Sequence, residues 1–403
     1  MKQTTALLAG VAALALTAGS AMAQVSGDVV KLGVLNDQSG TYADLAGPGS
    51  VVAARMAVED FGGTVLGKKI EVVFADHQNK PDVGSSVANR WIDTEQVDTI
   101  VDVGTSSVAL AIQEITSKKG IVHLNSTAAT SDLTGKACSP TGVHWTHNTT
   151  ALANGTGKAI VAQGGKTWFF LTADYAFGHA LERDVSKVVK EAGGEVKGAV
   201  RHPFPSQDFS SFLLQAQASG AKVIGLANAG ADTINSIKQA GEFGITQSGQ
   251  NLAGLLVFLS DVRSLGLKAA QGLQLTTGFY WDLDDETRAW SKRFAEKHGG
   301  AMPTMVQAGV YSAVTHYLNA IKAAGTDDGK TVVAKMKELP VKDFFARNAK
   351  LRADGRMVHD MYLVEVKKPE ESKGDWDYYK VLRTIPGDEA YGPVNADCPL
   401  VKG

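Results

Sequence analysis

Apolar strand-like segments alternate with amphipathic helix-like segments along most of this chain. In the segment that ends at Gly62, for example, Val51, Ala54, Val58 and Phe61 lie three or four residues apart. The strand-like segments of the first part are residues 29–35, 69–75, 99–103 and 121–124. Short apolar strands separated by helices are typical of a parallel sheet that is covered on both faces. The pattern therefore predicts an α/β fold with parallel sheets.

The alternation occurs twice. A second series begins with a helix-like segment at residues 150–163 and continues through strands such as 167–171 and 223–227. Each series spans about 125 residues, the size of an ordinary domain, so we expect two domains. Helix-like segments at residues 284–298 and 306–324 have no sheet of their own, and we expect them to cover one of the first two.

The first residues have the pattern of an export signal. Lys2 gives a positive start, residues 6–17 are apolar, and Ala21-Met22-Ala23 is a small-x-small cleavage sequence. The apolar run is shorter than the about 20 residues of a membrane-spanning helix. We expect residues 1–23 to be a signal peptide that is removed on export to the periplasm. A buried N-terminal helix is the disfavoured alternative, because the segment has no polar face.

Charge and cysteine usage restrict the possible partners. The chain has 40 basic and 42 acidic residues, so neither nucleic acid nor a lipid surface is expected as the main partner. In an oxidising compartment, the distant pair Cys138 and Cys398 predicts a structural disulfide, with two free thiols as the alternative. A metal site is disfavoured for these cysteines and for His144 and His147, which have few acidic residues nearby.

The catalytic motifs fail at identifiable residues. The segment 164–167 resembles the end of a phosphate-binding loop, but Ile160 stands where the first glycine belongs. The segment 104–108 resembles a nucleophile elbow, but Val108 replaces the glycine that ends it. We therefore expect no cofactor, no metal and no catalytic site. A hydrolase that uses Ser106 is the alternative, and it would need a His and an Asp within reach.

Hydroxyl-rich turns follow three strands of the first series, at residues 39–44, 104–107 and 125–132. In open α/β sheets, ligands bind at the carboxyl ends of the strands, beside the N-termini of helices. Uncharged hydroxyl and N–H donors there suit a carboxylate. Helix capping alone explains any one such turn. Three turns at one edge predict an anion site.

In this order and spacing, these segments resemble the family of periplasmic proteins that bind branched-chain amino acids for ABC importers. The matching segments are Ser39-Gly40, residues 54–63, residues 104–107, Ala128-Ala129-Thr130 and Tyr175-Ala176-Phe177-Gly178. The resemblance covers essentially the whole mature chain. It implies two Rossmann-like lobes joined by three hinge crossings near residues 147, 278 and 355. Lobe 1 would comprise residues 24–147 and 278–355, and lobe 2 residues 148–277 and 356–403.

The resemblance also implies a ligand site between the lobes. The family's carboxylate-binding hydroxyl falls on Ser106 or Ser107, and an aromatic side chain that closes from lobe 2 falls on Phe177. The complete set of expected ligand-binding residues is Tyr42, Ser106, Ser107, Ala128, Thr130, Tyr175, Phe177, Asn228 and Phe258. Such a protein is a monomer that captures a small molecule by hinge closure and delivers it to the permease subunits of an ABC importer. A ligand sensor for a membrane receptor is an alternative.

The chain departs from the family where an amino-acid ligand holds its ammonium group. An acidic residue is expected after the strand that ends near Gly254, but residues 255–258 are Leu-Leu-Val-Phe, and nothing ionisable follows before Asp261. An ammonium enclosed beside leucine lacks a partner, which costs several kcal/mol.

An aromatic acid suits this departure better than an amino acid. Aromatic side chains are available at Tyr42, Tyr175, Phe177, Phe258 and Tyr280. Residues 76–80 and 144–146 also resemble a subgroup associated with aromatic-acid uptake. We therefore predict a small planar aromatic carboxylate as the ligand, with an amino acid, an amide or an aliphatic acid as alternatives.

Overall fold

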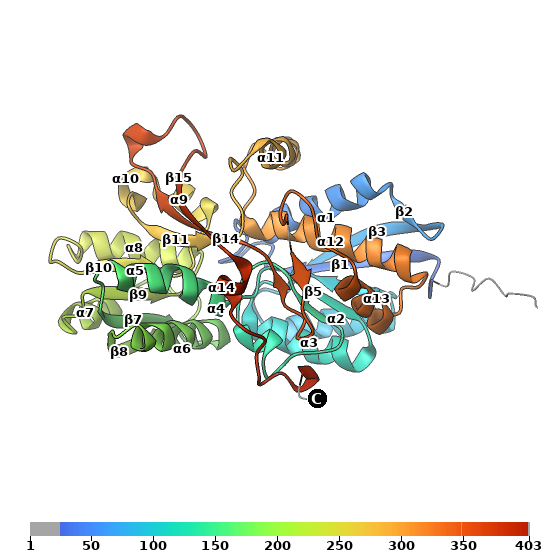
Figure 1. Ribbon diagram of the computed structural model, residues 1–403, viewed down its shortest axis with the longest axis horizontal. Coiled ribbons are helices and arrows are strands. Elements are labelled where there is room, and N and C mark those ends of the chain that lie inside the picture. Colours follow the sequence, from blue (N-terminus) through green and yellow to red (C-terminus); the bar gives the residue numbers. More distant parts are fainter. Residues whose placement is uncertain (1–24, 348, 402–403) are drawn as a thin grey trace, which may run out of the picture.

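The structure is a computed structural model that describes residues 25–347 and 349–401 (Figure 1). The expected signal peptide, residues 1–23, lies outside the described residues. Of the helices in the described ranges, none combines the length and apolar character that a membrane crossing requires.

A six-stranded sheet with the order β2-β3-β1-β4-β5-β6 forms the core of the first lobe. Its strands are β1 (Val29–Asn36), β2 (Thr64–Val65), β3 (Lys68–Asp76), β4 (Thr99–Val101), β5 (Val122–Asn125) and β6 (Gly142–His144), all parallel except β2. Helices α1 (Gly47–Phe61), α2 (Pro81–Asp93) and α3 (Ser106–Lys119) connect them. Alternate residues of β1 serve both faces: Leu32 and Val34 pack in the cluster with α1, and Leu35 packs in the cluster with α2 and α3.

The second lobe contains a four-stranded parallel sheet of order β10-β9-β7-β8 and a three-stranded antiparallel sheet of order β11-β14-β15. The strands are β7 (Thr167–Ala173), β8 (Glu195–His202), β9 (Val223–Ala227), β10 (Asn251–Gly254), β11 (Gln274–Thr277), β14 (Met361–Val366) and β15 (Tyr379–Ile385). The helices are α4 (Thr149–Leu152), α5 (Lys158–Ala162), α6 (Ala176–Glu191), α7 (Ser210–Ala218), α8 (Ala231–Glu242), α9 (Leu259–Leu265) and α10 (Leu267–Ala270).

The chain then returns to the first lobe before it completes the second. Helices α11 (Asp285–Lys297), α12 (Met305–Ala324) and α13 (Gly329–Glu338) follow β11, and α12 packs on α1 (Figure 1). Strands β12 (Lys350–Leu351) and β13 (Met357–Val358) follow, and β14 then pairs with β11. The two helix-like segments without a sheet thus belong to the first lobe, where both contact α1. The lobe boundaries themselves stay a prediction.

The crossing segments near residues 147 and 356 are held together by one buried arginine. The guanidinium of Arg356 donates to the carbonyl oxygens of Trp145, at 2.5 Å, and His147, at 3.2 Å. It also lies 4.4 Å from the ring centroid of Tyr391, in the short helix α14 (Gly387–Tyr391). The Tyr391 hydroxyl donates to the carbonyl oxygen of Thr146, at 2.6 Å.

The end of the chain lies against the first lobe. A disulfide joins Cys138 to Cys398, 260 residues apart, which confirms the expected bond. The family resemblance assigned residues 356–403 to the second lobe, but the disulfide returns the last residues to the first. Periodicity carried no information about this tail, because it forms only the short turn Pro399–Val401. The other short turns are Ser131–Thr134 and Pro369–Glu371.

Candidate ligand-binding site

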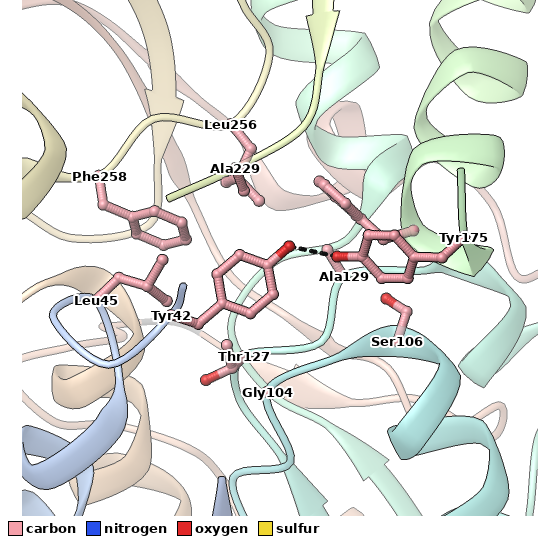
Figure 2. A pocket seen from close by; sticks show the side chains of 11 residues that line it. Tyr42, Leu45, Gly104, Ser106, Thr127, Ala129, Tyr175, Ala229, Leu256 and Phe258 are labelled. Atoms are coloured by element: carbon pink, nitrogen blue, oxygen red, sulfur yellow. Dashed lines mark hydrogen bonds between the residues drawn. The ribbon is translucent and has the colours of Figure 1, made fainter. Parts of the chain in front are cut away.

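A small cavity lies between the two lobes, where the carboxyl ends of their parallel strands face each other (Figure 2). The first lobe contributes Tyr42, Leu45, Gly104, Ser106, Thr127 and Ala129, and the second contributes Tyr175, Phe177, Ala229, Leu256 and Phe258. Each of these residues follows a strand of one of the two parallel sheets. None of them carries a charge, so the wall offers only hydroxyl groups, backbone amides, and apolar surface.

The turn before α3 places a hydroxyl group in the cavity wall. Ser106 is the first residue of α3, and its Oγ accepts a hydrogen bond from the Thr130 N–H at 3.2 Å. The Ser106 O–H therefore stays available to donate. The side chain of Thr105 does not cap the helix but donates to the Asn79 side chain. The N-terminus of α3 thus presents free N–H groups next to the Ser106 hydroxyl.

The buried side chains of Asp102 and His77 hold this turn in place. Asp102 directly follows β4 with φ +57°, and it accepts hydrogen bonds from Asn36 Nδ2, at 3.0 Å, and from the Thr127 hydroxyl. The N–H of Gly104 donates to His77 Nε2 at 3.1 Å, which requires a neutral imidazole. Burial lowers the pKa of His77 to about 4, so the imidazole is neutral at physiological pH. His77 and Asp102 are therefore positioning residues, and neither is among the site residues that the sequence predicts.

The second lobe covers the cavity with aromatic rings. Tyr175 and Phe177 lie at the start of α6, and the Tyr175 hydroxyl meets the Tyr42 hydroxyl of the first lobe at 2.5 Å (Figure 2). Phe204, which the sequence did not indicate, stacks on Tyr42 and Tyr175 with centroid distances of 5.3 and 4.5 Å. Tyr280 packs on Tyr379 instead and is not part of the wall.

Backbone contacts beside this aromatic cover show that the lobes are closed. The N–H of Ala231 donates to the carbonyl oxygen of Thr41 at 3.4 Å. Gly230 lies against the same carbonyl, so that a β-carbon at this position would be only 2.5 Å from the oxygen. Backbone from one lobe therefore touches backbone from the other.

Five of the nine expected residues line the cavity, namely Tyr42, Ser106, Tyr175, Phe177 and Phe258. The other four do not. Ser107 is the next residue along α3 and is half-buried, and Ala128 packs in the core while Ala129 takes its place in the wall.

Thr130 and Asn228 lie outside the cavity wall and hydrogen-bond to neighbouring residues. The Thr130 side chain caps the turn Ser131–Thr134 by accepting from the N–H of Asp132, at 3.3 Å. The amide of Asn228 donates to Ser236 Oγ, at 3.0 Å, and accepts from Thr233 Oγ1, at 2.7 Å. The side chains of both residues are thus engaged within their own lobes.

Comparison with known proteins identifies the family. Residues 29–375 match the family described as "Periplasmic binding protein". The chain belongs to this family. It is accordingly a solute-binding protein of the ABC-transporter type and not an enzyme.

Relatives of this binding protein match over nearly their full length. The "Leu/Ile/Val-binding protein homolog 6" of Brucella melitensis is 26% identical over 392 residues, covering 94% of this chain and 96% of the relative. A periplasmic binding protein from Burkholderia mallei is 52% identical, with a TM-score of 0.90 and coverage of 93% and 100%. A branched-chain amino-acid ABC transporter periplasmic ligand-binding protein from Burkholderia xenovorans is 45% identical, with a TM-score of 0.80 and coverage of 90% and 97%.

More distant solved structures share the fold and contain ligands. An ABC-transporter solute-binding protein from R. palustris in complex with benzoate is 24% identical, with a TM-score of 0.80 and coverage of 91% and 99%. A second from the same organism, in complex with 4-hydroxybenzoate, is also 24% identical, with a TM-score of 0.80 and coverage of 93% and 100%.

Proposed function

We propose that this periplasmic binding protein captures a small planar aromatic monocarboxylate and delivers it to the permease subunits of an ABC importer in the inner membrane. The observation that carries the proposal is Leu256 in the cavity wall, where an amino-acid ligand of this family finds an acidic partner for its ammonium group. The expected export signal supports delivery from the periplasm.

The wall divides into a polar end and an apolar remainder. Ser106 and the N-terminus of α3 offer uncharged donors, which hold a carboxylate without a buried counter-ion. Leu45, Leu256 and Phe258 offer apolar surface from both lobes. A flat ring with one acidic group matches both ends, and the small cavity favours a small ligand.

The next acidic residue along the sequence after Leu256 does not replace the missing ammonium partner. Asp261 is buried, and its Oδ2 accepts from the N–H of Phe258 at 2.9 Å, at the start of α9. Burial raises the pKa of Asp261 to about 7. Because its carboxyl group is outside the cavity wall and occupied by the backbone, an α-amino acid would leave its ammonium unpaired.

The benzoate and 4-hydroxybenzoate complexes of the two R. palustris proteins support the proposal at the level of the fold. They show that proteins of this fold can bind an aromatic acid. The wall residues of this chain suit the same class of ligand.

A thermal-shift panel tests the proposal. Benzoates and hydroxycinnamates should raise the melting temperature, whereas leucine, isoleucine and valine should leave it unchanged. A shift with leucine and none with benzoate would contradict the inference that Leu256 leaves the cavity without an ammonium partner. A shift only with aliphatic keto acids or short amides would retain the missing ammonium site but exclude the aromatic ligand. Genes for permease subunits beside the coding sequence would favour transport over a sensor role.

A further inference from the structure

The contact between the hydroxyl groups of Tyr42 and Tyr175 leaves one of the two hydroxyl hydrogens without an acceptor. Their oxygens are 2.5 Å apart. Burial raises the pKa of each tyrosine above its usual value, so both hydroxyls stay protonated. Only one proton can lie between the two oxygens. In the described part of the chain, neither oxygen has another hydrogen-bond partner, so one O–H lacks an acceptor.

The surroundings indicate where the second O–H can find an acceptor. Phe204 stacks against both rings and gives no acceptor on its side. Asp232 is buried nearby. Its Oδ1 accepts from the N–H of Ser206, at 3.1 Å, and its Oδ2 has no hydrogen-bond partner among the described residues, but neither oxygen is hydrogen-bonded to Tyr42 or Tyr175. Both tyrosines line the cavity, and in Figure 2 the Ser106 hydroxyl is directed toward the side on which they meet. The acceptor therefore belongs in the cavity.

We propose that the carboxylate of the ligand accepts this second tyrosine proton, which makes Tyr42 and Tyr175 a carboxylate-specific donor pair shared between the lobes. The inference rests on the proposed function, because it assigns that ligand's acidic group a second contact opposite Ser106. A hydrogen bond to a charged acceptor is about twice as strong as one to a neutral acceptor. The pair therefore favours an acid over its amide, and it is complete only in the closed protein.

A double-mutant cycle separates this role from that of a simple latch. The variants are Tyr42→Phe, Tyr175→Phe and the double variant, with dissociation constants for benzoate and benzamide measured by calorimetry. Each single variant retains one hydroxyl that can turn to the ligand, so benzoate binding should weaken only about 3-fold. The double variant has no donor left, and it should lose about 30- to 100-fold, more than the product of the single losses. Its preference for benzoate over benzamide should fall as well.

The opposite pattern would overturn the inference. If the pair only latched the lobes, the first substitution would break the contact and the second would add nothing, with the acid-to-amide preference unchanged. Tyr280→Phe is the matched control, because it removes a hydroxyl from a buried tyrosine outside the cavity wall and should leave both constants unchanged. The melting temperatures of the ligand-free variants check that they fold.

A failure of the proposed function can be told apart from a failure of this inference. If benzoate does not bind the wild-type protein, the same cycle is run with isobutyrate and isobutyramide. Preference for isobutyrate, with the same more-than-multiplicative loss, would exclude the aromatic ligand and retain the donor pair. If the wild-type protein binds neither acid more tightly than its amide, the donor pair is wrong.

Discussion

Substitution of Gly230 by alanine should leave the protein folded but unable to close fully. Gly230 has φ 59° and ψ −136°, a combination that residues with a β-carbon rarely adopt. A β-carbon there would also lie 2.5 Å from the Thr41 carbonyl oxygen and 3.0 Å from the Tyr42 ring. The first effect acts within the second lobe and is present whether the lobes are open or closed. The second effect exists only in the closed protein.

These two effects have separate magnitudes. Strained backbone of this kind destabilises a fold by about 1–3 kcal/mol, which lowers the melting temperature of the ligand-free protein. The clash with Thr41 is an overpacking of similar size, about 1–3 kcal/mol, and it opposes closure alone. If closure provides the binding energy, the ligand dissociation constant should rise by about 10- to 100-fold.

The assay combines binding with a measure of compactness. Calorimetry with benzoate, or with whichever acid shifts the wild-type protein, gives the affinity, and small-angle X-ray scattering reports whether ligand reduces the radius of gyration. Gly392→Ala is the control for strain, because Gly392 has φ 64° and ψ −164° with open space around it. It should lower stability without changing affinity. Gly230→Ala protein that binds with wild-type affinity and contracts normally would refute the reasoning.

Three further predictions follow from the site and the core. Ser106→Ala should weaken carboxylate binding by about 1.5–3 kcal/mol in calorimetry, whereas Ser107→Ala, outside the wall, should have little effect; equal losses would contradict the geometry. Replacing Cys138 and Cys398 by serine should lower the free energy of unfolding by up to about 4 kcal/mol in urea, and free thiols in unreduced protein would exclude the bond. Burial raises the pKa of Asp232 from 3.8 to about 7, so its contribution to stability falls as pH rises through that window. Asp232→Asn should therefore be more stable than wild type to urea at pH 8 but not at pH 4, and an equal difference at both would count against this pKa.

Local patterns were sufficient for most of the fold. The spacing of Val51, Ala54 and Val58 predicts α1, because it places these apolar residues on one face of a helix that can pack on the sheet. The helix predicted at residues 150–163 is instead interrupted by a π turn at Ala153–Gly157. There Gly155 packs against Thr276 of β11, and the hydroxyls of Thr156 and Thr276 lie 2.8 Å apart. This contact is distant in sequence, so periodicity could not reveal it.

The candidate site shows the same division between local and distant information. The hydroxyl-rich turns at strand ends indicate Ser106, and the absence of an acidic residue after Gly254 indicates Leu256. Both residues line the cavity. Phe204 was missed because it belongs to no turn motif and matters only when the lobes meet. His77 was noted only as part of a family resemblance. Its role depends on a hydrogen bond to Gly104, 27 residues away in the chain.

The contacts at the hinge and at the cleft differ in strength in a way that fits capture by closure. Arg356 is fully buried, donates to backbone carbonyls of a neighbouring crossing segment and stacks on Tyr391. Burial lowers its pKa only to about 10, so it stays charged at neutral pH and its hydrogen bonds are charge-assisted. If the crossing segments separated, the buried guanidinium of Arg356 would lose carbonyl partners, which is costly for a buried charge. We therefore expect these segments to stay together when the lobes move.

At the aromatic side of the cleft, by contrast, the lobes meet through neutral groups. These are the hydroxyl pair of Tyr42 and Tyr175, the stacked Phe204 and the 3.4 Å contact between Ala231 and Thr41. Neutral hydrogen bonds contribute only about 0.5–1.5 kcal/mol each, because water replaces them when the cleft opens. We therefore expect the lobes to separate more easily on this side than at the crossing segments that Arg356 holds. A ligand that adds one charged acceptor to these neutral contacts would favour the closed protein over the open one.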